Sequence, residues 1–157
     1  MKFLCALVTL PLLFLTHGCG GPAEDAAVPQ AQRAAASDAD IGDHIVHFSA
    51  QSTNNLSPEV ARQYGIVRSK SRAMLNVSVL RKDTGAAALA DVQVKAVNLA
   101  GQLKNVTMRK IEIQEAIYYI GETGIANQET LVFTISITPE GSSEASEVRF
   151  TREFYTN

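Results

Sequence analysis

A period of two runs through Thr130-Leu131-Val132-Phe133-Thr134-Ile135-Ser136-Ile137-Thr138. In extended backbone, the apolar side chains at 131, 133, 135 and 137 share one face, and hydroxyls at 130, 134, 136 and 138 share the other. This alternation is typical of a strand that is buried on one face only. Pro139-Glu140-Gly141 then offers turn residues, so we expect an antiparallel partner strand directly after it.

The partner strand is predicted at residues 147–154, where Val148, Phe150 and Phe154 share the apolar face. Arg152 is in phase with the two phenylalanines. Its side chain either snorkels to solvent or contributes to a polar pocket. A polar pocket between a sheet edge and a helix would involve Tyr64, Asn76 and Asn98, and the sequence leaves both interpretations open.

Five earlier segments also have strand character, at residues 44–50, 73–82, 92–99, 105–113 and 116–121. About seven strands in a domain of this size predict an all-β fold, an immunoglobulin-like or fibronectin-III-like antiparallel β-sandwich with one short helix. In the fourth segment the apolar positions change phase between Met108 and Ile111. We expect a β-bulge near Arg109 and Lys110, at a sheet edge.

The short helix is expected within Ser57-Pro58-Glu59-Val60-Ala61-Arg62-Gln63-Tyr64-Gly65. Its signals are local: an N-cap serine, proline at the first helical position, an acidic first turn and a terminating glycine. Val60 and Tyr64 are spaced i and i+4, so they share the face that packs inward. The helix should join the first two strands across an end of the sandwich.

Directly after the helix, Arg68, Lys70 and Arg72 alternate with smaller residues. In extended backbone these cations would form a basic stripe at a sheet edge. Together with Tyr64 they are the candidate interaction surface, suited to an anionic envelope component or to an acidic surface of an envelope protein. The alternative is a solvated edge whose charges oppose aggregation.

The N-terminus has the layout of a secretory signal, because Lys2 precedes a run of about a dozen apolar residues that is too short to span a membrane. Gly18 directly before Cys19 predicts a signal peptide at residues 1–18 and lipidation of Cys19, with ordinary cleavage as the alternative. Residues 19–41 are rich in Ala, Pro and Gln, so we expect a flexible linker before a domain at residues 42–157. The expected location is the outer membrane facing the periplasm, or else the soluble periplasm.

Composition excludes several function classes. Residues 42–157 hold 12 Lys and Arg against 12 Asp and Glu, so a nucleic-acid partner is not expected. They contain no cysteine, which excludes thiol catalysis and thiolate metal sites there. His44 and His47 are weak metal candidates, because residues at i and i+3 of a strand point to opposite faces. Met74 or Met108 would have to complete a copper site.

No catalytic constellation is apparent, so we expect a protein that is not an enzyme and that needs no cofactor. Two histidines in one strand offer few options for a serine triad. Paired carboxylates such as Glu112 and Glu115 fall on an expected hairpin, where they would be solvated.

Several separated blocks resemble one protein family: residues 57–66, 68–72, 75–80, 98–99, 101–103 and 116–121. They are similar to the proteobacterial domain of unknown function 4426, over essentially all of residues 42–157. The resemblance implies an exported, envelope-associated β-sandwich with no established activity and no catalytic residues to transfer. The expected function is therefore a non-catalytic interaction module. A small-ligand or copper carrier is the first alternative, and a structural spacer is the second.

Overall fold

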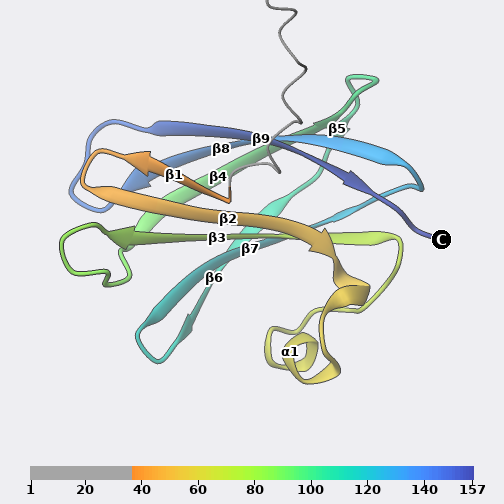
Figure 1. The fold of residues 1–157 in the computed structure, drawn as a ribbon, viewed down its shortest axis with the longest axis horizontal. Helices are drawn as coiled ribbons and strands as arrows, with labels where there is room; N and C mark the ends of the chain where they lie inside the picture. The colour runs from red at the N-terminus through yellow and green to blue at the C-terminus, as the bar shows by residue number, and fades with distance from the viewer. Residues whose placement is uncertain (1–36) are drawn as a thin grey trace, which may run out of the picture. The chain divides into compact units, whose positions relative to one another are not determined.

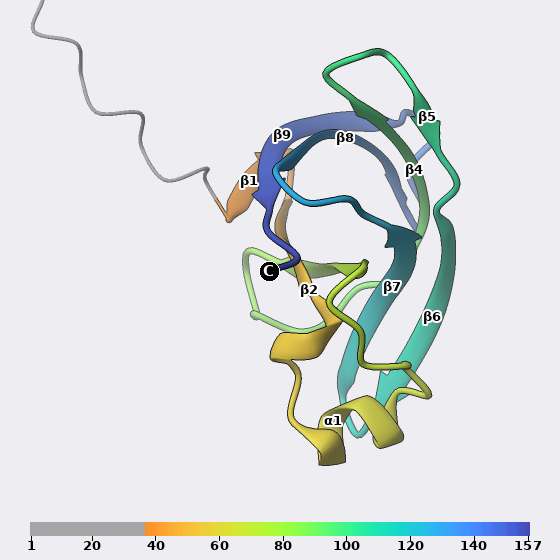
Figure 2. The same cartoon turned by 90° about the vertical axis from the view of Figure 1, so that its right-hand side faces the viewer.

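The computed structural model of the chain describes residues 37–157. The expected signal peptide, Cys19 and the linker up to residue 36 lie outside the described residues. Two antiparallel sheets face each other, as Figures 1 and 2 show; sheet A has the strand order β1-β2-β3-β7-β6 and sheet B the order β5-β4-β8-β9. The predicted β-sandwich is confirmed, with nine strands instead of seven. Within residues 37–157, no helix is both long and apolar enough to cross a membrane.

The elements in chain order are β1 (Asp38–Ile41), β2 (His44–Ser52), the 3₁₀ turn η1 (Thr53–Asn55), α1 (Pro58–Gln63), β3 (Arg72–Arg81), β4 (Ala90–Asn98), β5 (Leu103–Lys104), β6 (Thr107–Ile113), β7 (Ala116–Gly124), β8 (Glu129–Pro139) and β9 (Ser146–Phe154).

The two additional strands are β1 and β5. β1 pairs with β2 from Asp38 opposite His47 to Ile41 opposite His44, so folded structure begins before the boundary expected at residues 41 and 42. β5 has two residues, which pair with the end of β4. Neither strand has a period long enough to recognise in sequence, because β1 is largely polar and β5 is very short.

The main core lies between the sheets and is built by the predicted period of two. Leu131, Phe133, Ile135 and Ile137 of β8 are all buried there. The ring of Phe150 lies 5.0 Å from that of Phe133 and 4.8 Å from that of Phe48, measured between ring centroids, so three aromatic side chains connect sheet B to β2. The buried aromatic surface in these contacts helps to hold the two sheets together.

A second, smaller core lies on the opposite face of sheet A, under α1. It consists of Leu56, Ala61, Ile66, Met74 and Ile120, with Val60, Tyr64, Ile111 and Tyr118 packed around it. The predicted inward packing of Val60 and Tyr64 is therefore confirmed. The helix lies on the outer face of sheet A (Figure 2), and it does not cross an end of the sandwich.

This second core also explains the phase change in β6, and the expected β-bulge is wrong. The β6–β7 ladder runs without interruption from Thr107 opposite Glu122 to Ile113 opposite Ala116. Met108 faces the main core, whereas Ile111 faces the core under α1. β6 is therefore a regular strand that buries one face at Met108 and the opposite face at Ile111, and this produces the change of phase in the sequence. The predicted edge position is correct, because β6 ends the order of sheet A.

The helix itself forms as its local signals predict. The Ser57 side chain accepts a hydrogen bond from the Val60 amide at 3.2 Å, and Pro58 occupies the first turn. Gly65 has φ +63°, a left-handed conformation that a glycine adopts without the steric cost of a Cβ atom.

Candidate functional site

The predicted basic residues lie in two different settings. Arg68 and Lys70 belong to a loop between α1 and β3, which we call the basic loop (residues 66–71). Arg72 is the first residue of β3. β3 is the central strand of sheet A, with β2 on one side and β7 on the other. The expectation of a basic stripe at a sheet edge is therefore wrong, because the loop turns before the strand begins.

The basic loop is held by one buried hydroxyl. Thr53 is completely buried, and its Oγ1 accepts a hydrogen bond from the Ser69 amide at 2.9 Å. The same hydroxyl lies 3.0 Å from the Val67 carbonyl oxygen and 3.1 Å from the Ser69 carbonyl oxygen, either of which accepts its proton. In addition, Arg68 donates to the carbonyl of Asn54 at 2.9 Å. The loop is consequently tied to the end of β2 and presents its cations from a defined position.

Replacing Thr53 by Val should release this loop. Valine has a similar shape but leaves the Ser69 amide without its acceptor in a partly buried setting, so we expect the free energy of unfolding to fall by about 1–3 kcal/mol. Urea unfolding measures the loss, and faster hydrogen exchange at the Ser69 amide localises it. Thr134→Val, on the solvent face of β8, should change stability by less than about 0.5 kcal/mol. Equal effects of the two substitutions would contradict the role given to Thr53.

Arg72 is engaged in a charge network next to the helix. Its guanidinium lies 3.4 Å from Glu122, and Arg109 approaches the same carboxylate at 3.7 Å. Arg109 also donates to the carbonyl of Tyr64, at the C-terminal end of α1. A cation is favourable there because the terminal carbonyls of a helix carry partial negative charge. Arg109 thus holds the helix to the sheet, and Arg72 and Arg109 share Glu122 as a local anionic partner.

The remaining cations differ in this respect. Within residues 37–157, five Lys and Arg side chains form no salt bridge: Arg68, Lys70, Lys95, Arg149 and Arg152. Two of them share the basic loop, where Val67 between helix and strand is 67% exposed. The basic loop thus presents an exposed aliphatic side chain beside two cations that have no acidic partner.

The expected polar pocket of Tyr64, Asn76 and Asn98 does not form. Asn98 lies on β4 of sheet B, whereas Asn76 is on β3 of sheet A and Tyr64 packs against Tyr118 with ring centroids 6.5 Å apart. Asn98 has a structural role, since its side chain accepts hydrogen bonds from the amides of Ala100 and Gln102 in the turn after β4. The Oδ1 atom of Asn76 is buried and has no hydrogen-bond partner among the described residues.

Asn98 also contributes to a nearly buried ion pair. Glu129 accepts hydrogen bonds from Asn98 at 3.0 Å, from Lys104 at 2.6 Å and from the Ala126 amide at 2.8 Å. Burial raises the pKa of Glu129, but these hydrogen bonds together outweigh it and hold that pKa below its ordinary value. The site joins β4, β5 and β8 and has a structural character.

The weak metal candidates are not brought together. His44 and His47 lie three residues apart on β2 and so point to opposite faces, and Met74 and Met108 belong to the two different cores. Within the described part of the chain, no three His, Cys, Asp or Glu side chains are grouped so that they could hold a metal ion. His44 lines a hollow of about 570 Å³ near Asp43, Glu140 and Glu144.

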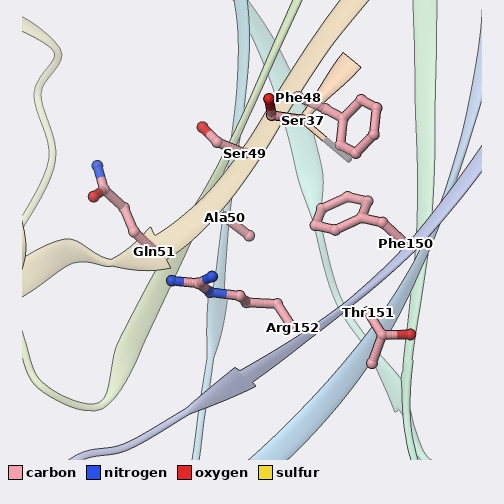
Figure 3. A pocket seen from close by; sticks show the side chains of 8 residues that line it. All are labelled: Ser37, Phe48, Ser49, Ala50, Gln51, Phe150, Thr151 and Arg152. Atoms are coloured by element: carbon pink, nitrogen blue, oxygen red, sulfur yellow. The ribbon is translucent and has the colours of Figure 1, made fainter. Parts of the chain in front are cut away.

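A pocket of about 240 Å³ opens between the two sheets, where β2 faces β9 (Figure 3). Its lining comprises Ser37, Phe48, Ser49, Ala50, Gln51, Phe150, Thr151 and Arg152. Figure 3 shows Arg152 reaching from β9 towards β2, while the rings of Phe48 and Phe150 face one another further along the pocket. The sequence signal for this site was an arginine in phase with two phenylalanines. Nothing in the sequence indicated that residues of β2 would complete this pocket. Nor did any sequence pattern indicate the separate ion pair of Arg109 and Glu122.

Comparisons with known proteins agree with this geometry. A family model described as "Domain of unknown function (DUF4426)" matches residues 38–157, beginning at the first residue of β1. The crystal structure of a DUF4426 family protein from Pseudomonas aeruginosa PAO1 is 31% identical, with a TM-score of 0.67, over 76% of this chain and 94% of that chain. A search of the curated proteins finds no match.

Two more distant structures share the fold. FetP of uropathogenic Escherichia coli strain F11, expressed recombinantly in the E. coli periplasm, is 10% identical with a TM-score of 0.57, over 77% of this chain and 94% of FetP. A copper-bound variant of FetP is 9% identical with a TM-score of 0.54, over 74% and 93% of the two chains. At these identities the likeness concerns the fold alone. The family model and the Pseudomonas structure go further, and the chain belongs to the DUF4426 family, whose function is unknown.

Proposed function

We propose that this protein is a non-catalytic binding module of the bacterial cell envelope, anchored by a lipid on Cys19 in the outer membrane and facing the periplasm. Its basic loop contacts the anionic headgroups of a lipid surface. The observation that carries this proposal is the combination of Arg68 and Lys70, both without a salt bridge, with the exposed side chain of Val67.

This combination matches the chemistry of a lipid surface. Anionic headgroups attract each nearby cation by about 1 kcal/mol, and an adjacent aliphatic side chain gains by entering the boundary of the acyl chains. The hydrogen bonds of Thr53 favour binding as well, because a loop that is already ordered loses little conformational entropy at the surface. The linker expected from the sequence, about 20 residues long, would have an r.m.s. span of roughly 25 Å, so the anchor would raise the local concentration of the domain at the membrane and a weak contact would be sufficient to orient it.

Vesicle binding tests the contact without the anchor. The chain from Gly20 to Asn157 is sedimented with vesicles of equal parts phosphatidylethanolamine and phosphatidylglycerol, in parallel with vesicles of phosphatidylcholine alone. Arg68→Gln combined with Lys70→Gln should weaken partition onto the anionic vesicles by about 30-fold, because two headgroup contacts of about 1 kcal/mol are lost. Binding should also fall with added salt.

The matched control is Lys95→Gln with Arg149→Gln, which removes the same charge from the outer face of sheet B. This variant should retain most of the binding. Equal weakening by both double variants would mean that only net charge matters, and no binding by the wild-type chain would leave a protein surface as the partner. The anchor is tested separately by intact mass: a multi-acyl increment on Cys19 in the membrane fraction, lost in Cys19→Ala, is expected. A bare chain in the soluble periplasm would overturn it.

A metal carrier is the alternative, and its support is the fold that this chain shares with copper-bound FetP. The ligands would come from His44, His47 and a methionine. The two histidines point to opposite faces of β2, and Met74 and Met108 lie in different cores. Equilibrium dialysis against copper and zinc decides this alternative: stoichiometric binding that His44→Gln abolishes would establish it.

A further inference from the structure

We propose that the pocket between β2 and β9 binds a small monocarboxylate with a short apolar body, whose carboxylate pairs with Arg152. This site is separate from the basic loop and does not depend on the membrane contact. It follows from three features of the pocket: an open strand edge, an aromatic floor and a cation without an anionic partner.

The opening results from the length of β1. β1 covers β2 only from His44 to His47, and just beyond it the Ser37 carbonyl accepts a hydrogen bond from the Phe48 amide at 2.8 Å. Within the described residues, no strand pairs with the rest of β2 on this side. β9 is likewise the edge of sheet B. The two sheets therefore leave a gap that solvent and a small molecule can enter.

The floor of the gap is apolar. Phe48 and Phe150 are both largely buried and lie 4.8 Å apart, and Ala50 adds a small side chain that leaves room beside them. An aromatic or short aliphatic group gains by leaving water in such a place. The volume of about 240 Å³ is below the range of about 300–1,000 Å³ that holds drug-sized molecules. A single ring or a short chain is the appropriate size.

Arg152 determines the charge of the ligand. It lies on β9 in phase with the buried Phe150 and Phe154 but is itself exposed at the mouth of the pocket, and it forms no salt bridge within residues 37–157. A guanidinium presents paired N–H donors that match the two oxygens of a carboxylate. One cation suits one negative charge. A dianionic phosphate would call for more than one cation.

Benzoate is the probe, and benzamide is the neutral control of nearly the same shape. Each is titrated into labelled chain from Gly20 to Asn157 at constant ionic strength, and chemical shifts of the Ala50 methyl, the Phe150 ring and the Arg152 guanidinium are followed. Benzoate should cause saturable shifts at these three positions, and benzamide should bind at least about tenfold more weakly because it lacks the charge-assisted hydrogen bonds.

Arg152→Gln should weaken benzoate binding about tenfold or more, and Arg152→Lys should recover part of it, because lysine restores the charge without the planar fork. Arg149→Gln is the matched control on the other face of the same strand and should bind as the wild type does. Shifts that fall on the basic loop, equal binding of benzamide, or unchanged binding by Arg152→Gln would each overturn the proposal. In that case Arg152 merely snorkels to solvent over the two phenylalanines.

Discussion

Phe133→Ala is expected to lower the free energy of unfolding by about 3–5 kcal/mol, because it removes a buried ring and leaves a cavity in the middle of the main core. Phe133 is 1% exposed, and its ring stacks on that of Phe150, which in turn contacts Phe48 of sheet A. The loss is a large part of the 5–15 kcal/mol that is typical of a domain. Urea unfolding followed by far-ultraviolet circular dichroism measures it, since the chain contains no tryptophan.

The control is Val132→Ala, the adjacent residue on the outer face of β8. Its side chain is only half-buried, so the expected loss is about 1 kcal/mol or less. The slope of unfolding against urea should be the same for both variants, because the surface exposed on unfolding changes little. Similar losses at the two positions would contradict the assignment of faces on which the whole sandwich rests.

Glu129→Gln is expected to cost about 2–4 kcal/mol at neutral pH. The Glu129 side chain is 10% exposed and that of its partner Lys104 is 21% exposed, so the substitution leaves a cation in a poorly solvated place. Glutamine also presents an amide group where the carboxylate accepted three hydrogen bonds. Glu147→Gln, an exposed position on β9, should change stability by less than about 0.5 kcal/mol.

The effect of Glu129→Gln should depend on pH in a defined direction. The pKa of Glu129 is lower in the folded state than its ordinary value of 4.5, so the unfolded chain binds more protons in mild acid. The stability contributed by this carboxylate is therefore complete above pH 4.5 and is lost as pH falls through the folded pKa. The difference between wild type and variant, measured by urea unfolding across this range, should narrow in acid. A difference that stays constant with pH would exclude the charge as its cause.

The two predicted surfaces have different requirements, which makes them separable. The basic loop is held by Thr53, and its proposed contact is with a lipid surface, whereas the pocket depends on how far β1 extends along β2. Thr53→Val should therefore weaken vesicle binding and leave benzoate binding intact. Phe133→Ala should weaken benzoate binding and leave vesicle binding intact, because Phe150 then loses the ring on which it stacks.

Local signals were sufficient for much of the fold. The cap of Ser57, the proline after it and Gly65 act within a few residues of one another, so α1 is at the predicted place. The strict alternation in β8 likewise predicts both its extent and its buried face. β1 and β5 were not predicted, because their own composition does not mark them as strands. β1 is a strand because it pairs with β2, and β5 because it pairs with β4.

The candidate sites were only partly accessible from sequence. Arg68, Lys70 and Arg72 stood out as charges, but only Arg72 has an acidic partner, Glu122, which comes from a strand distant in the sequence. Asn98 looked like a pocket residue and instead accepts hydrogen bonds from its own turn. Arg152 was conspicuous beside its phenylalanines, although nothing near it in the chain indicates that β2 completes the pocket.

The amino-acid pattern alone therefore established the β-sandwich, the short helix, the balanced charge of the domain and the family resemblance. Tertiary structure decided that sheet A buries part of its outer face under α1 as well as its inner face, that the basic residues divide between a loop and a central strand, and that a pocket opens beside β1. The physical reason is range. Caps and periodicity act over a few residues, whereas ion pairing and cavities depend on which distant segments the sheets bring together.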